Sequence, residues 1–227
     1  MAAKVDGNTV RTRRTRARIL AESLRLFNEE GEVRVTTGRI ADSLGISPGN
    51  LYYHFRNKDE IVEELFAAFE GRVDLQPGAA PAGPEAIEDL WLYLHLLFEA
   101  IREYRFLYRN LDDLVARNRR LRERYHRIVE RKLAAVVALC EGLVRVRAMR
   151  ARPDEIRALA ANVLVVATYW LSFQALRRRP GRAPDEGAEL GRGAFQVMAL
   201  VAPYLAGEAC AHLDRLGRSY IDEGEAP

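Results

Sequence analysis

The chain has 227 residues, of which 48% are hydrophobic and 30% are charged, so it is neither collagen-like, nor of low complexity, nor wholly disordered. Lys and Arg number 35 against 32 for Asp and Glu, and a net charge of +3 is too small to indicate a partner by itself. Cys140 and Cys210 have no CxxC spacing and give no indication of a disulfide scaffold or a zinc site. The basic N-terminus lacks the apolar stretch of a secretory signal, so we expect a cytoplasmic protein.

Helical signals follow one another closely through the first third of the chain. Apolar residues recur at helical spacing, and the predicted helices cover 15–30, 37–44, 48–55 and 58–71. Thr36 is a typical N-cap for the second helix. Ser47 and Pro48 are typical of the N-cap and first residue of the third, because proline lacks an N–H group that would be unpaired there in any case.

The remaining two thirds of the chain also have helical periodicity. A segment rich in Pro and Gly at 76–84 predicts a loop, and the helices beyond it are predicted over 87–101, 106–116, 119–147, 154–179, 186–206 and 207–221. Strand signals are nearly absent. The sequence therefore predicts an all-α fold with an N-terminal three-helix helix-turn-helix domain and a larger helical domain beyond it.

Charge and composition divide this fold into three parts. Residues 1–14 form a basic arm, which we expect to be disordered. Residues 15–57 form the helix-turn-helix domain, and residues 58–227 form the larger helical domain, in which 58–71 is a connecting helix.

The third helix has the chemistry of a DNA-reading element. Leu51 and Phe55 are four residues apart and anchor one face to the core. The outward face then carries small, amide, phenol and imidazole groups, of which Asn50 can pair with adenine through two hydrogen bonds. Phenol and imidazole donors suit phosphates, which position a protein on DNA without specifying sequence. The alternative, an exposed aromatic cluster for a protein partner, is less consistent with the basic arm.

A longer run of residues resembles a known family. Thr36-Thr37, Ile40-Ala41 and LGISPGNLYYHFRNKDEIV are similar to the N-terminal DNA-binding domain of TetR-family transcriptional regulators, over about residues 16–66. Matched position by position, the resemblance implies phosphate contacts by Thr37, Tyr52, His54 and Lys58, and a surface facing the bases formed by Pro48, Gly49, Asn50 and Tyr53.

The resemblance also implies that the C-terminal domain dimerises and holds a small apolar or aromatic effector between its helices. Candidate pocket residues are aromatic side chains on the predicted helices: Trp91, Tyr93, Tyr104, Tyr169 and Phe173. For each of them, ordinary core packing is the competing interpretation. A later face of Ala194, Val197, Met198, Val201 and Leu205 is predicted to complete a four-helix bundle across a two-fold axis.

Residues 158–176 contain no charge and are long enough to span a bilayer. Alanine and internal polar residues dilute their hydrophobicity, so we expect no stable membrane insertion and assign them to the core and a subunit interface.

The sequence gives no support for catalysis. The four histidines are scattered, and no glycine-rich phosphate loop follows a strand, so no enzyme activity, cofactor or metal is expected. We therefore predict a homodimeric, ligand-responsive regulator, a repressor bound to a palindromic double-stranded operator. The alternative is a helical lipid- or drug-binding protein with a basic arm that binds polyanions without sequence preference.

Overall fold

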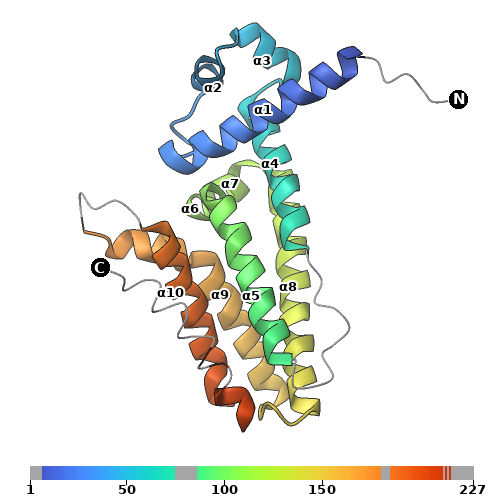
Figure 1. Ribbon diagram of the computed structural model, residues 1–227, viewed down its shortest axis with the longest axis vertical. Coiled ribbons are helices and arrows are strands. Elements are labelled where there is room, and N and C mark those ends of the chain that lie inside the picture. Colours follow the sequence, from blue (N-terminus) through green and yellow to red (C-terminus); the bar gives the residue numbers. More distant parts are fainter. Residues whose placement is uncertain (1–6, 75–85, 180–184, 212, 214, 216–227) are drawn as a thin grey trace, which may run out of the picture. The chain divides into compact units, whose positions relative to one another are not determined.

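A computed structural model describes residues 7–74, 86–179, 185–211, 213 and 215 (Figure 1). Their regular structure is helical, and no strand occurs within these ranges, which confirms the predicted all-α class. The helices are α1 (Gly7–Glu30), α2 (Thr37–Leu44), α3 (Pro48–His54), α4 (Lys58–Val73), α5 (Ala86–Glu103), α6 (Arg105–Arg109), α7 (Leu111–Arg117), α8 (Arg119–Arg145), α9 (Pro153–Arg177) and α10 (Glu186–Val201), and a 3-10 turn over Ala202–Tyr204 follows α10. The loop predicted at 76–84 and most of the helix predicted over 207–221 lie outside the described residues.

The chain forms two compact units. The N-terminal unit comprises the residues up to 70 together with 104–110, and the C-terminal unit comprises 71–103 and the residues from 111 onwards. The predicted boundary at residue 58 therefore differs from the observed one. Most of α4 belongs to the first unit because its apolar residues Ile61, Phe66 and Phe69 are buried there. The short helix α6 joins them, since the ring of Phe106 lies 5.3 Å from that of Phe27.

Helix α1 begins at Gly7, so the structure differs from the predicted disordered arm over residues 7–14. This segment contains no proline, and its arginines are good helix formers, so nothing in it stops the helix before Gly7. Residues 1–6 lie outside the described part of the chain.

Local capping determines where α2 and α3 begin and end. The Thr36 side chain accepts a hydrogen bond from the Arg39 N–H group, and the Ser47 side chain accepts one from Asn50, which confirms both predicted N-caps. Gly45 ends α2 with a φ of +64°, a left-handed conformation that glycine adopts without steric cost. Pro48 is the first residue of α3.

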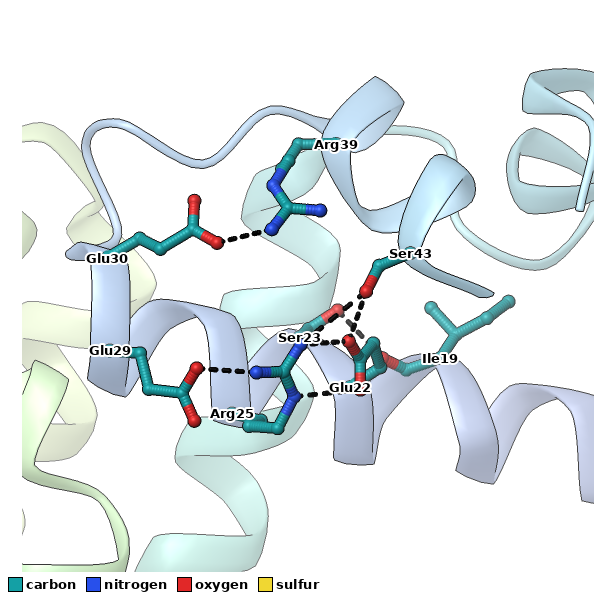
Figure 2. A network of polar contacts seen from close by, with 8 residues as sticks. All are labelled: Ile19, Glu22, Ser23, Arg25, Glu29, Glu30, Arg39 and Ser43. Atoms are coloured by element: carbon teal, nitrogen blue, oxygen red, sulfur yellow. Dashed lines mark hydrogen bonds and ion pairs between the residues drawn. The ribbon is translucent and has the colours of Figure 1, made fainter. Parts of the chain in front are cut away.

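A polar network connects α2 to α1 (Figure 2). Arg25 pairs with Glu22 and Glu29 on its own helix, and the Ser43 hydroxyl of α2 donates to Glu22. The Arg25 hydrogen bond lowers the pKa of Glu22, against a smaller opposing effect of burial. Because these side chains are partly exposed, the network specifies the position of α2 more than it stabilises the fold.

In the C-terminal unit, α5, α8, α9 and α10 form a closed ring of neighbours: α5 packs on α8, α8 on α9, α9 on α10, and α10 on α5. The approach of α10 is close, because a Cβ added at Gly193 would lie 2.6 Å from Trp170 of α9 and 2.8 Å from Phe98 of α5. One predicted assignment is corrected here. The face of α10 expected to complete a bundle across a two-fold axis fills the chain's own core, with Ala194, Val197, Met198 and Val201 buried.

Candidate nucleic-acid interface

Helix α3 is anchored by one buried residue and its cap, and the rest of its surface is open. Leu51 and Phe55 have no exposed surface, whereas the side chains of Tyr52 and Tyr53 are 51% and 75% exposed. The remaining outward positions, Pro48, Gly49 and Asn50, are also exposed. Two large phenol rings held in solvent are unusual in a well-packed domain, and they indicate a surface that meets a partner.

A groove of about 660 Å³ runs between the N-terminal half of α1 and this face of α3. Its lining residues are Arg11, Thr12, Arg14, Thr15, Arg18, Ile46, Asn50, Tyr53 and His54. Three arginines therefore line the same groove as Asn50 and Tyr53, two of the residues expected to face bases. Within the described residues, none of these three arginines forms an ion pair with a carboxylate, so their charge is available to phosphates.

Arg11 and Arg14 were expected to lie in a disordered arm and Arg18 in the first helix, and the wall that the three form was not predicted. The signal was present in the spacing of Arg11, Arg14 and Arg18, because residues three and four apart share one helix face. What could not be read from the spacing is that this face meets the third helix.

Arg16 has a different role from its neighbours. Its guanidinium lies 4.0 Å from the centre of the Phe55 ring, donates to the His54 carbonyl oxygen, and pairs with Glu64 of α4. The side chain thus connects the end of α3 to α1 and α4. The basic cluster is therefore divided: Arg16 holds the recognition helix in place, and Arg11, Arg14 and Arg18 line the groove beside it.

His54 lines this groove, in edge-to-face contact with the Tyr53 ring. Burial lowers the pKa of its imidazole, and the charge of Arg16 lowers it further. The ring is therefore neutral at physiological pH, and it is suited to a hydrogen bond with a phosphate rather than to an ion pair.

Two of the residues predicted to contact phosphates are hydrogen-bonded to each other. The hydroxyl groups of Thr37, in the first turn of α2, and Tyr52, on α3, lie 3.0 Å apart. This hydrogen bond fixes the two side chains relative to each other, and each hydroxyl keeps capacity for one further partner.

Lys58 is less free than the resemblance implies. Its ammonium donates to the Glu32 backbone carbonyl oxygen at 2.9 Å and lies 3.0 Å from the Glu32 carboxylate, whose side chain has no exposed surface. Glu32 was not among the predicted site residues, because nothing local indicates that a glutamate in this loop is buried. A phosphate contact by Lys58 remains a prediction.

The predicted pocket residues are not brought together. Tyr104 is buried in the N-terminal unit, where its ring lies 5.8 Å from that of Phe69, as the competing interpretation of core packing expects. Tyr93 is buried in the C-terminal unit, whereas Tyr169 and Phe173 lie exposed on α9. Trp91 is on α5, but its side chain lies outside the described residues.

Among the described residues, no group of three or more His, Cys, Asp or Glu side chains could hold a metal ion. Burial raises the pKa of the Cys140 thiol to about 11, as expected for a core residue that is not reactive. In the described ranges, α9 alone is long and apolar enough to cross a membrane by length and composition, and 39% of its most apolar window is buried.

A capped turn between two short helices, an exposed reading face and an adjacent wall of arginines are the features of a helix-turn-helix DNA-binding protein. Comparison with known proteins specifies which kind. Residues 19–65 match the family model for bacterial regulatory proteins of the tetR family, and residues 63–213 match the TetR model described as a bacterial transcriptional repressor.

Individual relatives agree with these matches. The chain is 30% identical to the transcriptional regulator AcrR of Shigella flexneri over 94 residues, and 31% identical to TtgR of Pseudomonas putida over 112 residues. These alignments cover 40% and 49% of this chain and 44% and 49% of the relatives, so the chain matches about half the length of each. A TetR-family regulator from Marinobacter aquaeolei has a similar structure, with a TM-score of 0.80 and 36% identity over 91% of this chain and 98% of that one.

The chain therefore belongs to the TetR family of bacterial transcriptional regulators, which are DNA-binding proteins and not enzymes. The resemblance inferred from residues 16–66 is confirmed, and the family match extends to residue 213.

Proposed function

We propose that this protein is a cytoplasmic repressor that binds a palindromic operator as a homodimer and is released by a small apolar or aromatic effector. The observation that carries the DNA-binding part is the groove between α1 and α3. Three arginines line it together with Asn50, Tyr53 and His54, so phosphate attraction and base reading would act at the same place.

In this proposal, the residues divide by the kind of DNA group they meet. Asn50 and Tyr53, with the close approach allowed by Pro48 and Gly49, face the bases. Thr37, Tyr52, His54 and Lys58 meet phosphates, and the arginines of the groove add to them. Two copies related by a two-fold axis would present two α3 helices to successive major grooves.

The exposed face of α9 supports the homodimer. Val165, Tyr169, Phe173 and Leu176 follow one another at helical spacing, and their side chains are between 45% and 86% exposed. The opposite face of α9 packs on α8 and α10. An apolar stripe on a helix that is already packed on its other side favours a second subunit over membrane insertion. We therefore assign Tyr169 and Phe173 to the subunit interface.

The test is binding of the purified protein to the DNA upstream of its own gene, against a scrambled duplex, over a series of salt concentrations. We expect saturable preference for the upstream DNA with two chains per site. Equal binding to both duplexes, abolished by modest salt, would contradict the proposal and support the alternative of a helical ligand-binding protein with a polyanion-binding arm.

A matched pair of variants tests the groove itself. Arg14 lines it, whereas its neighbour Arg13 is exposed on α1 but does not line it. We expect Arg14→Ala to lower the slope of log affinity against log salt by about one, because one phosphate contact is lost. Arg13→Ala should leave the slope unchanged, and equal effects of the two variants would contradict the role of the groove.

A further inference from the structure

A buried lysine interrupts the apolar face of α8. Ile128, Lys132 and Val136 are four residues apart along this face, and all three are buried, the lysine being only 8% exposed. Its ammonium donates to the carbonyl oxygen of Val73, the last residue of α4, and lies 4.7 Å from the centre of the Tyr93 ring on α5. All of these groups belong to the C-terminal unit.

The surroundings of Lys132 match its charge poorly. An ammonium has three N–H donors, and the structure supplies one carbonyl oxygen and the face of a ring. No carboxylate lies within ion-pair distance of it among the described residues, because nearby Asp74 pairs instead with Arg131 at 2.9 Å. Burial therefore lowers the pKa of Lys132 to about 8, with the charge of Asp74 opposing the shift and that of Arg131 adding to it.

The ring that lies beside this ammonium has an unmatched group of its own. Tyr93 is 7% exposed, and its buried hydroxyl has no hydrogen-bond partner in the described part of the protein. Burial raises the pKa of this phenol, so the hydroxyl stays protonated and remains a donor. Buried hydroxyl groups in folded proteins are nearly always bonded.

Lys132 has N–H donors left over, and the Tyr93 hydroxyl is a donor with no acceptor, so both side chains can donate to a further acceptor. The positive charge of the lysine favours an acceptor that is negatively charged. We propose that these two side chains bind the anionic head group of the effector, a carboxylate or similar organic acid, whose apolar part packs against the neighbouring side chains of α5 and α8. This inference rests on the proposed function and specifies the chemical class of its effector. A cation would be repelled by Lys132, and a neutral ligand would leave its charge unmatched.

Effector binding at this site would also affect the C-terminal end of α4, because Lys132 donates to the carbonyl oxygen of Val73 there. A bound carboxylate would compete with the Val73 carbonyl oxygen for the N–H donors of Lys132. The bond that holds the C-terminal end of α4 would then weaken when the effector binds.

The test compares acids with neutral analogues of the same shape. Straight-chain carboxylates of about six to sixteen carbons and naphthalene-2-carboxylate would each be titrated into the full-length protein by calorimetry, alongside their primary amides. We expect at least one acid to bind about tenfold more tightly than its amide, since a charge-assisted contact in a buried site is worth at least that factor. If no acid in the series is preferred to its amide, the proposal is wrong.

Variants then assign the preference to the site. Lys132→Met keeps the length of the side chain and should abolish the preference for the acid, and Lys132→Gln should do the same if the methionine variant folds poorly. Tyr93→Phe should reduce the preference several-fold. Arg127→Gln removes an exposed cation from the same helix and should change nothing. A preference that survives in both Lys132 variants would overturn the assignment.

Calorimetry without DNA separates this inference from the proposed function. Acid binding that depends on Lys132 but leaves operator binding unchanged would support the site and contradict effector release. Operator binding together with no preference for acids would support the proposed DNA-binding function and contradict the acid site at Lys132.

Discussion

The two units of the protein differ in whether their buried charged groups find a partner of opposite charge, and in where they expose large apolar side chains. In the N-terminal unit, the buried carboxylate of Glu32 has the ammonium of Lys58 beside it, and the large exposed rings are those of Tyr52 and Tyr53 on the reading face. In the C-terminal unit, Lys132 is buried without a carboxylate partner among the described residues, and α9 exposes a stripe of apolar residues. The buried carboxylate of Glu32 in the first unit therefore has a cation beside it, whereas the buried ammonium of Lys132 in the second has no carboxylate partner among the described residues. Under the proposed function, this ammonium and the exposed stripe of α9 are where an effector and a second subunit would bind.

The largest expected effect tests the internal matching of the N-terminal unit. Lys58→Met should destabilise the protein by about 3–5 kcal/mol, because it leaves the fully buried carboxylate of Glu32 without its cation. Urea unfolding would measure the loss. The double variant Glu32→Gln with Lys58→Met should recover most of it, and a double variant as unstable as the single one would contradict the pairing.

The next effect tests the mismatch of Lys132 in the other unit. Its pKa is about 8 in the folded protein against an ordinary lysine value of 10.5, so between these two pH values the unfolded state binds more protons. Stability from this group therefore rises with pH through that window, by about 3 kcal/mol at most. Below pH 8, both states are protonated and the full penalty of burial applies.

Comparison with Lys132→Met isolates this contribution from the other groups that titrate at high pH. The difference in unfolding free energy between the variant and the unmodified protein should be greatest near neutral pH and should shrink between pH 8 and 10.5. A difference that does not change with pH would show that Lys132 is not buried as a charge.

A smaller effect tests the packing of the four-helix ring. Gly193→Ala places a methyl group against two rigid rings, those of Trp170 and Phe98, and should cost about 1–3 kcal/mol. Thermal unfolding would detect it. Gly71→Ala is the control, because no atom lies within 4 Å of the added Cβ on this exposed helical residue. It should be neutral or slightly stabilising, and a similar loss in both variants would point to helix propensity and not to close packing.

The smallest effect sharpens the role of the reading face. Asn50→Ala should leave stability nearly unchanged, because Asn50 is exposed and its capping contribution comes from the backbone N–H group. Discrimination between the operator and a duplex with one substituted adenine should fall by about 1 kcal/mol, at the low end for a two-bond contact. Competition binding with the two duplexes measures it, and unchanged discrimination would mean that Asn50 does not read a base.

Features that depend on near neighbours could be predicted from the sequence alone. Thr36 and Ser47 cap helices because their side chains reach an N–H group three residues further along the chain. The outward face of α3 could be predicted in the same way, from the four-residue spacing of Leu51 and Phe55 on the opposite face. The run from Gly49 to Lys58 carries the family resemblance within a single stretch of chain. The all-α class, the helix-turn-helix and the exposure of the outward face of α3 therefore followed from the sequence.

Only the tertiary structure decided which side chains meet across longer separations. It paired Glu32 with Lys58 and placed Tyr104 in the core of the N-terminal unit. It also packed the apolar face of α10 against the other helices of the same chain. It also set Lys132 beside Tyr93, although nothing around either residue in the sequence indicates the other. A helical pattern determines which residues share a face, but the segment that covers that face depends on packing among distant parts of the chain. That packing decides whether a buried charged group has a partner, as Glu32 does, or is left available to a ligand, as we propose for Lys132.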